Sequence, residues 1–320
     1  MLAWTTTDSS GGLALVEAPD PVPLPHELIV RVDAFAPNPG DVAALSTAPR
    51  GSIPGWDGSG VVLCPAADGA GPRQGDRVVF LSLSAGGWAQ QRAVPHAMTA
   101  TAADLPHARL ATLPVPATSA LRALRRLGSV LGRRILIVGA TSSVGRFAVQ
   151  LAARSGARVV AVARNVQQHA ALRALGAEET HATLSSVKSR VHGAIDVVGG
   201  QHLVDAYALL EPESTVIALG HAAGSGEHFP YGAFVADPMT SGRSISSFFL
   251  GAESDLAPDM AYLAQDRSLD VGDLDRRPWT DLASWIEQGA TRSSGRIVFE
   301  VDHRATMTTE EAPTDRSEPR

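Results

Sequence analysis

The feature that most constrains the fold is one stretch, Arg134–Asn165, in which the apolar pattern changes its period twice. Ile135–Val138 is an unbroken apolar run of strand length, as expected for a parallel strand buried on both faces. From Val144 onward the apolar residues recur at helical spacing, and Arg158–Ala163 has strand character again. The stretch therefore predicts a βαβ unit with a tight turn between its first strand and its helix.

The turn of this unit is a degenerate form of the dinucleotide fingerprint. In that fingerprint, GxGxxG lets the backbone pass close to a pyrophosphate at a helix N-terminus. Here the three positions read Ala140, Ser142 and Gly145, so only the last glycine is kept. Because serine hydroxyls can donate to phosphate oxygens, we interpret the turn as cofactor-binding, with a ligand-free turn as the alternative. The residues assigned to it are Ala140, Thr141, Ser142, Ser143 and Val144.

The end of the second strand indicates which dinucleotide is bound. NAD sites carry a carboxylate about 20 residues after the glycines, because it accepts hydrogen bonds from the ribose hydroxyl. This chain has Ala163, Arg164 and Asn165 there. An arginine without a neighbouring acid suits a 2′-phosphate, so Arg164 and Asn165 predict NADPH. A solvated arginine at a strand end is the alternative.

Composition limits the function classes. The chain has 320 residues, enough for two domains, and a formal net charge of −6, which gives no basic surface for nucleic acid. Its single cysteine, Cys64, excludes an internal disulfide and any cysteine-rich zinc site. We see neither a leader sequence nor a run of membrane-spanning length, and therefore expect a cytoplasmic protein without a membrane partner.

Composition and apolar pattern divide the chain into two parts. The first part, to about residue 115, is rich in proline and glycine, with short alternating segments typical of a mostly β domain. Prolines around residue 115 mark a boundary, after which Ser119–Leu127 reads as a helix. Further helices are expected at 168–175, 203–210 and 279–288, and further strands at 194–198, 215–219, 244–250 and 296–301. The polar stretch His303–Arg320 is expected to be a disordered tail.

Several blocks, taken in order, resemble the medium-chain dehydrogenase/reductases, and among them the zinc-independent quinone and enone reductases. These blocks are Pro54–Val62, Gly75–Val78, Gly86–Ala89 and the turn Gly139–Gly145. The resemblance implies an α/β fold in which a Rossmann-type doubly wound parallel sheet accompanies a GroES-like, mostly β catalytic domain. It also implies these limits: a catalytic domain at 1–116, an NADP-binding domain at 117–252, a return segment at 253–302 and a tail at 303–320.

The resemblance also bears on metal binding. Zinc-dependent relatives hold their metal with a cysteine and with the histidine of a Gly-His-Glu block. The corresponding stretches here are Asn38–Asp41 and Gly55–Asp57, which contain no thiol or imidazole. None of the ten histidines forms a close pair at ligand spacing. No metal site is therefore predicted, and carbonyl reduction assisted by zinc becomes the less favoured chemistry.

The reacting end of the site is assigned through the resemblance. Asn38 and Asp41 match a block beside the nicotinamide, where Asn38 or a nearby backbone N–H is expected to bind the substrate carbonyl. An Asx-type turn with Asp41 capping the next helix is the alternative. Ser119 matches a threonine that touches the nicotinamide carboxamide. The remaining cofactor-side residues by resemblance are Leu219, Gly220, His221, Phe249, Leu250 and Arg296.

The predicted function is an NADPH-dependent reductase acting on an activated C=C bond or a quinone. No tyrosine lies between Asp41 and Pro54, where some relatives have a proton donor, so water is the simplest proton source. One alternative is a biosynthetic reductase of an enoyl or iminium natural-product intermediate. Another is an NADPH-binding sensor or scaffold without turnover. The expected partners are a small-molecule substrate and, from the family, a second copy of the chain.

Overall fold

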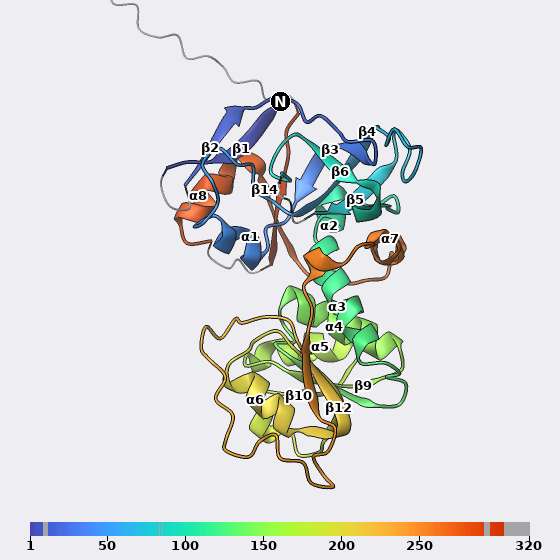
Figure 1. The fold of residues 1–320 in the computed structure, drawn as a ribbon, viewed down its shortest axis with the longest axis vertical. Coiled ribbons are helices and arrows are strands. Elements are labelled where there is room, and N and C mark those ends of the chain that lie inside the picture. The colour runs from blue at the N-terminus through green and yellow to red at the C-terminus, as the bar shows by residue number, and fades with distance from the viewer. Residues whose placement is uncertain (9–11, 83, 85, 291–294, 304–320) are drawn as a thin grey trace, which may run out of the picture.

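The computed structural model describes residues 1–8, 12–82, 84, 86–290 and 295–303. Two lobes lie one above the other in Figure 1, with the N-terminus in the upper, β-rich lobe and a parallel sheet in the lower one. The segment expected to be a disordered tail lies outside the described residues, apart from His303. No helix among the described residues is both long and apolar enough to span a bilayer.

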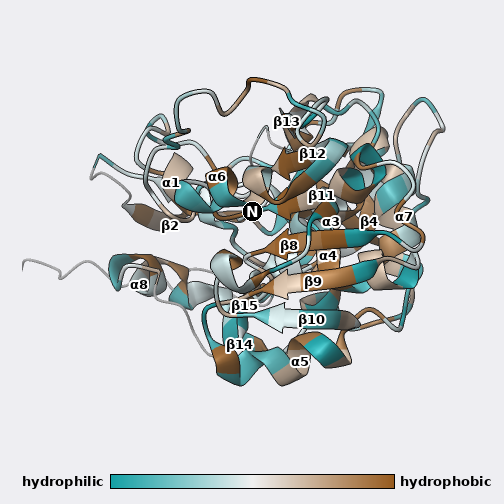
Figure 2. Ribbon diagram, turned by 90° about the horizontal axis from the view of Figure 1, so that it is seen from below, coloured by the Kyte–Doolittle hydropathy of each residue, from teal (hydrophilic) through white to brown (hydrophobic). Residues whose placement is uncertain are grey.

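The lower lobe is built on a six-stranded, wholly parallel sheet in the order β10-β9-β8-β11-β12-β13. Figure 2 shows the central strands as hydrophobic and the edge strand β10 as more polar. The strands are β8 Arg134–Val138, β9 Arg158–Val162, β10 Ala177–His181, β11 Val191–Asp196, β12 Leu210–Ala218 and β13 Ser244–Ser247. The helices are α3 Pro114–Arg126, α4 Ser143–Arg154, α5 His169–Ala174 and α6 Gln201–Ala208.

Alternation along β8 explains why both faces of this sheet are covered. Ile135 and Ile137 pack into one apolar cluster with α3 and α4, whereas Leu136 and Val138 pack into another with α6. Successive side chains of a strand point to opposite faces, so a continuous apolar run requires helices on both sides. This confirms the predicted Rossmann-type doubly wound sheet.

The upper lobe contains a seven-stranded sheet in the order β14-β15-β3-β4-β5-β7, with β6 paired to β3, and a separate β1–β2 pair. Its last two strands come from the C-terminal segment of the chain, which returns to this lobe. The strands are β1 Leu2–Thr6, β2 Leu13–Glu17, β3 Glu27–Phe35, β4 Asp57–Cys64, β5 Arg77–Leu81, β6 Gln91–Pro95, β7 Thr99–Thr101, β14 Leu274–Pro278 and β15 Arg296–Glu300. The helices are α1 Pro39–Ala44, α2 His107–Leu110 and α8 Leu282–Glu287.

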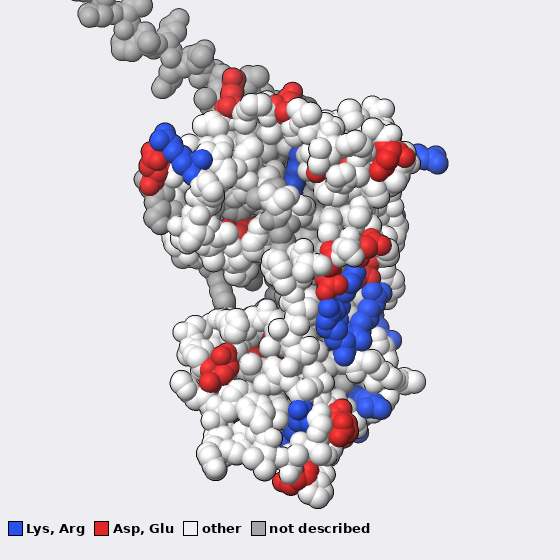
Figure 3. Space-filling model, viewed as in Figure 1, with Lys and Arg blue, Asp and Glu red and all other residues white. Residues whose placement is uncertain are grey.

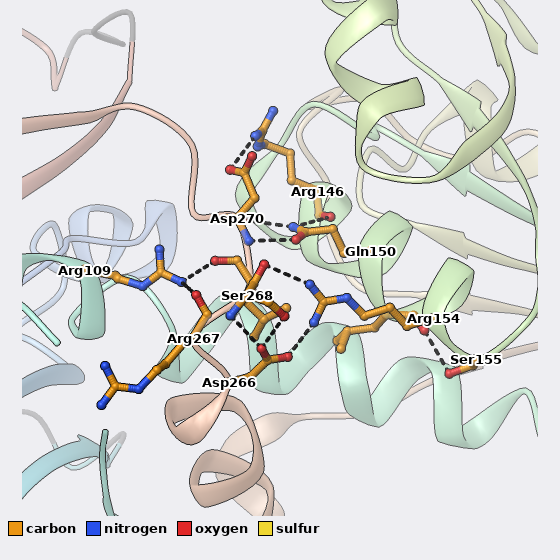
Figure 4. Close-up of polar contacts among 11 residues, drawn as sticks. Arg109, Arg146, Gln150, Arg154, Ser155, Asp266, Arg267, Ser268 and Asp270 are labelled. Carbon is orange, nitrogen blue, oxygen red and sulfur yellow. Dashed lines mark hydrogen bonds and ion pairs between the residues drawn. The ribbon is translucent and has the colours of Figure 1, made fainter. Parts of the chain in front are cut away.

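The segment after α7 (Ala257–Gln265) ties the two lobes together (Figure 4). Arg109 of α2 donates to the carbonyls of Arg267 and Leu269. From the other lobe, Gln150 of α4 exchanges two hydrogen bonds with the backbone of Asp270, at 2.9 and 2.8 Å. Further arginines of α3 pair with acids of this return segment, and Figure 3 shows basic side chains facing acidic ones beside the junction of the lobes.

Some predicted elements differ from the structure. The helix expected from Ser119 begins at Pro114, so the prolines read as a boundary lie in its first turn, where proline is tolerated. The predicted limit between residues 116 and 117 therefore falls inside α3. The strand expected to reach Leu250 ends at Ser247. Strand β10, Ala-Glu-Glu-Thr-His, was not predicted, because an edge strand needs no apolar run.

Candidate active site

The turn between β8 and α4 has the geometry of an anion-binding corner. Ser142 is the N-cap of α4, and its Oγ accepts a hydrogen bond from the Gly145 N–H at 3.0 Å. A Cβ on Gly145 would collide with the carbonyl of Gly139, so the one retained glycine permits the close approach of helix and strand. The degenerate motif thus keeps the glycine that packing requires.

Free donors point out of this corner. The N–H groups of Ser143 and Val144 are in the first turn of α4, where no intrahelical acceptor exists, and they have no partner among the described residues. The Ser142 hydroxyl is used as an acceptor by the cap but keeps its own hydrogen. Ala140 differs from the expectation, because its side chain is buried and its N–H donates to the Val162 carbonyl at 3.1 Å.

Arg164 lies just beyond the end of β9, the strand next to β8. It is exposed, and its guanidinium makes no hydrogen bond or ion pair to any described residue. Asn165 instead accepts a hydrogen bond from the Gln167 N–H at 3.0 Å and so caps a short 3-10 turn. Ala163, where NAD sites have an acid, is buried. An anion at the corner would therefore meet a free cation beside it and no carboxylate at that strand end.

The loops after β11 and β12 lie against each other at the same edge. The Leu219 N–H donates to the Asp196 carbonyl at 2.8 Å, and Gly220 packs on the carbonyl of Val197. His221 is exposed and pairs with Glu227 at 3.4 Å. The carboxyl ends of parallel strands meet at one edge, and Figure 2 shows the strand arrowheads pointing to the side where α1 lies. The structure thus brings Leu219, Gly220 and His221 to the same edge as the corner.

Two residues expected beside the nicotinamide behave differently from each other. Phe249 is exposed, with its ring available to a ligand. Leu250 is buried in the apolar cluster formed with α3 and α4, so its side chain is part of the core rather than of a ligand surface. Only the first of the pair has a side chain free to contact a cofactor.

In the other lobe, Asn38 is the centre of a buried polar cluster. Its side-chain Nδ2 donates to Asp41 Oδ2 and to Asp57 Oδ1, both at 2.9 Å. Its Oδ1 accepts from Arg296 Nη2 at 2.9 Å. The three residues Asn38, Asp41 and Asp57 are 6 %, 2 % and 2 % exposed. Both amide hydrogens of Asn38 are used within the protein, which leaves none for the substrate carbonyl that it was expected to bind.

Asp41 holds the start of α1 and the neighbouring turn. Its Oδ2 accepts from the backbone N–H of Asn38 at 2.7 Å, and its Oδ1 accepts from the Trp56 N–H at 3.0 Å. The first bond caps α1 and matches the alternative interpretation of this residue. The Trp56 ring in turn lies against the backbone of Gly40 and packs on an apolar cluster that contains residues of both lobes. Asp41 therefore fixes a tryptophan at the junction of the lobes.

Asp57, at the start of β4, was not among the predicted site residues. Its Oδ2 accepts from the Val115 N–H at 3.0 Å, which joins the cluster to the first turn of α3. Burial, and after it the charge of Asp41, raises the pKa of Asp57 to about 7. Burial also raises the pKa of Asp41. The cluster thus holds a carboxyl that titrates near neutral pH.

Ser119 and Arg296 complete the picture of the predicted reacting end. Ser119 is half-buried and lies one helical turn after Val115, on the same face of α3. Val115 is the residue whose N–H donates to Asp57. Arg296 was assigned to the cofactor, but its Nη2 donates to Asn38 Oδ1 and to the Ala36 carbonyl, both at 2.9 Å. It is a member of the Asn38 cluster.

Comparison with known proteins shows which proteins the chain resembles. Residues 143–265 match a family model described as zinc-binding dehydrogenase. A 2-methylene-furan-3-one reductase from Solanum lycopersicum is 27% identical over 198 residues, which cover 56% of this chain and 51% of that protein. The structure of a quinone oxidoreductase from Pseudomonas syringae superimposes with a TM-score of 0.80 at 22% identity, covering 94% of this chain and 100% of that one.

The chain is similar to members of the medium-chain dehydrogenase/reductase superfamily, and among them to quinone oxidoreductases and related reductases. This confirms the resemblance seen in the sequence. A segment of an erythronolide synthase from Saccharopolyspora erythraea is also similar, at 32% identity over 209 residues, covering 61% of this chain and 6% of that protein. The chain spans about half the length of the Solanum lycopersicum reductase.

The matched family model covers only part of the site. Residues 143–265 run from α4 to α7 and include neither Asn38–Asp41 nor Gly55–Asp57. The zinc named in the description of that model therefore gives no information about those two stretches. In the part of the chain that the structure describes, no three His, Cys, Asp or Glu side chains are grouped so as to hold a metal ion.

Proposed function

We propose that this protein is an NADPH-dependent reductase that transfers hydride to an activated C=C bond or a quinone without zinc. The observation that carries the proposal is the corner at the head of α4. There, the N–H groups of Ser143 and Val144 have no partner among the described residues, and Arg164, equally without one, follows the end of the neighbouring strand β9. Helix N-termini bind phosphates through such groups, and a free guanidinium matches a phosphate better than a hydroxyl.

The residues of the lower lobe have distinct roles in this proposal. Thr141, Ser142 and Ser143 hold the pyrophosphate with backbone and hydroxyl donors, while Arg164 binds the 2′-phosphate. Asn165 shapes the loop through its cap rather than by direct contact. Gly220, His221 and Phe249 lie on the side of the nicotinamide, at the edge where the strands end. The fit of the donor set favours NADPH over NADH.

The upper lobe supplies the reacting end. When bound, NADPH supplies the hydride. Asn38 acts through others: its amide holds Asp41 and Asp57, which fix the Trp56 N–H and the first turn of α3. Ser119 keeps a hydroxyl with no partner among the described residues, available to orient the carboxamide of the cofactor. Positioning of this kind provides much of the rate when no strong acid is needed.

The proposal is consistent with how relatives are named. One relative is a 2-methylene-furan-3-one reductase and others are quinone oxidoreductases, names that fit hydride transfer to a conjugated system. A second candidate, a biosynthetic reductase of an enoyl intermediate, is favoured by the similarity to part of an erythronolide synthase. The two differ in substrate size and tethering rather than in the chemistry of the site.

We also propose that the protein forms a homodimer. Strand β13 is an edge of the six-stranded sheet, paired only with β12 on one side. Its sequence Ser-Ile-Ser-Ser carries none of the charges that protect exposed edges. Light scattering during size-exclusion chromatography tests this: a mass near twice 33.3 kDa is expected, and a mass near 33.3 kDa at all concentrations contradicts it.

The experiment that tests the function follows NADPH consumption with a panel of simple enones, quinones and imines, beside a thioester-linked enoyl substrate. Turnover of small enones or quinones supports the first candidate. Turnover of the thioester-linked enoyl substrate alone supports the second. Tight NADPH binding without consumption by any member of the panel contradicts both and favours a sensor or scaffold.

A further inference from the structure

Arg92 is an arginine on an otherwise apolar strand face. It lies in β6, where alternate residues are buried, and shares its face with the fully buried Val94. Arg92 is 3 % exposed, and its guanidinium lies 5.5 Å from the centre of the Phe80 ring. Burial lowers the pKa of Arg92 to about 10, so it remains a cation at neutral pH. A buried cation is costly, and hydrogen bonds to its N–H groups offset part of that cost.

Both Nη groups of this guanidinium donate to the backbone, whereas the buried Nε has no hydrogen-bond partner among the described residues. Nη1 donates to the carbonyls of Gly55 and Trp56, at 3.2 and 2.8 Å, and Nη2 donates to the carbonyl of Ser82 at 2.7 Å. No carboxylate of the described residues lies within ion-pair distance of it. One planar group therefore joins the turn before β4, at Gly55 and Trp56, to the loop after β5, at Ser82. Such a fork cannot be reproduced by a lysine, which has a single nitrogen.

The turn that Arg92 holds is tightly enclosed and requires a glycine. Gly55 has φ +93°, a conformation that side chains disfavour, and a Cβ there would collide with the Trp88 ring. The Trp88 N–H donates to the Pro54 carbonyl at 3.0 Å, and the Gly87 N–H donates to the Gly55 carbonyl at 2.9 Å. The turn leads directly into Trp56 and Asp57, which belong to the candidate active site.

We infer that Arg92 is a positioning residue for this site: by fixing the carbonyls of Gly55 and Trp56, it sets the placement of the Trp56 indole and the Asp57 carboxyl. The inference rests on the proposed function, because it names the residue that shapes the reacting end. The Trp56 backbone is held from two sides, by Asp41 at its N–H and by Arg92 at its carbonyl. Without the guanidinium, the turn keeps its backbone hydrogen bonds and the bond from the Trp56 N–H to Asp41.

Two variants separate the charge of Arg92 from its geometry. R92K keeps a cation but loses the fork, and R92M keeps the approximate length of the side chain without charge. R134M is the matched control. Arg134 is another largely buried arginine, and it forms an ion pair with Glu179. It is the first residue of β8, at the opposite end of that strand from the corner. Thermal melting followed by circular dichroism first identifies which variants are folded. If R92M is not folded, R92K takes its place in the measurements below.

The first readout is turnover of 1,4-benzoquinone with NADPH. For R92M we expect KM for the quinone to rise about tenfold and kcat to fall severalfold, with R92K between R92M and the parent protein. NADPH affinity, measured from nicotinamide fluorescence, should change less than about twofold because the corner lies in the other lobe. R134M should match the parent protein. Unchanged quinone kinetics in folded R92M would overturn the inference.

A second readout does not depend on turnover. The contribution of Trp56 to the fluorescence emission is isolated by repeating each measurement in a Trp56→Phe background. In R92M the Trp56 contribution should shift in wavelength and become more accessible to acrylamide, and in R134M it should not. If no protein reduces the quinone, the failure lies with the proposed quinone reduction rather than with Arg92, and this readout still decides about Arg92. An unshifted Trp56 signal in R92M would then overturn it.

Discussion

The side-chain amide of Asn38 donates one hydrogen to Asp57 Oδ1 at 2.9 Å and the other to Asp41 Oδ2 at the same distance. This relationship changes the chemistry assigned to Asn38. An amide that already holds two carboxylates cannot also stabilise charge developing on a substrate. The cluster is better understood as a buried support that ties α1, the Gly55–Asp57 turn and α3 together. Three elements thereby present one surface to the junction of the lobes.

Asp57 should make stability depend on pH. Its pKa is about 7 in the folded protein against 3.8 in a free chain, so the folded state keeps a proton that the unfolded state has lost between these values. The free energy of unfolding due to Asp57 therefore falls as pH rises from about 4 to 7, by up to roughly 4 kcal/mol. Urea unfolding of the parent protein and of D57N at several pH values measures it.

The difference between those two proteins is the decisive quantity. Titrating groups that do not interact with residue 57 cancel, and the groups around it, namely Asp41, Arg92 and Arg296, stay in place. The stability of the parent protein relative to D57N should decrease across this pH window and level off above it. A difference that stays constant from pH 4 to 8 would show that Asp57 is ionised throughout.

Ser142 should separate the helix cap from phosphate binding. Ser142→Ala removes the acceptor for the Gly145 N–H and should lower stability by about 1 kcal/mol. Ser142→Asp keeps an acceptor at the cap and suits the helix dipole, but it places a negative charge in the corner. Its stability should stay near that of the parent protein while NADPH affinity falls on the order of tenfold or more. Urea unfolding and nicotinamide fluorescence measure the two effects, and undiminished NADPH binding by S142D would count against the corner.

Arg164 should determine the choice between cofactors. Arg164→Asp replaces a free cation by an anion, so binding of NADPH should weaken on the order of tenfold or more while binding of NADH changes little. Arg173→Asp is the control, because Arg173 is also exposed but lies farther along, on α5. Dissociation constants for both nucleotides are measured in the same buffer. If R164D keeps the preference of the parent protein for NADPH, the 2′-phosphate is bound elsewhere.

The parts of the fold that could be predicted from the sequence are those with local signals. The βαβ unit around Gly145 was predicted because Ile135–Val138 and the apolar stripe of α4 each fit one period over a few residues. Strand β10 escaped prediction because it is polar and lies at a sheet edge. The start of α3 was placed late because Pro114 and Pro116 were read as a break, although both fit a first helical turn.

The candidate site shows the same division. The corner residues are consecutive in sequence, so their grouping was visible. The roles of Asp57 and Arg92 were not visible in the sequence, because their partners are distant along the chain. Asp57 accepts from Val115, 58 residues later, and Arg92 donates to Trp56, 36 residues earlier. Arg296 joins Asn38 across 258 residues, a separation that local patterns cannot anticipate.

Hydride transfer from NADPH to the substrate is tested most directly by following the transferred hydrogen as deuterium. NADPH carrying deuterium at the reactive carbon of its dihydropyridine ring is incubated with the protein and a panel of enones, and the products are examined by mass spectrometry and NMR. The account predicts a saturated ketone with one deuterium at the carbon β to the carbonyl, formed as NADPH is consumed. Recovery of unlabelled enones from a protein that binds NADPH would contradict it.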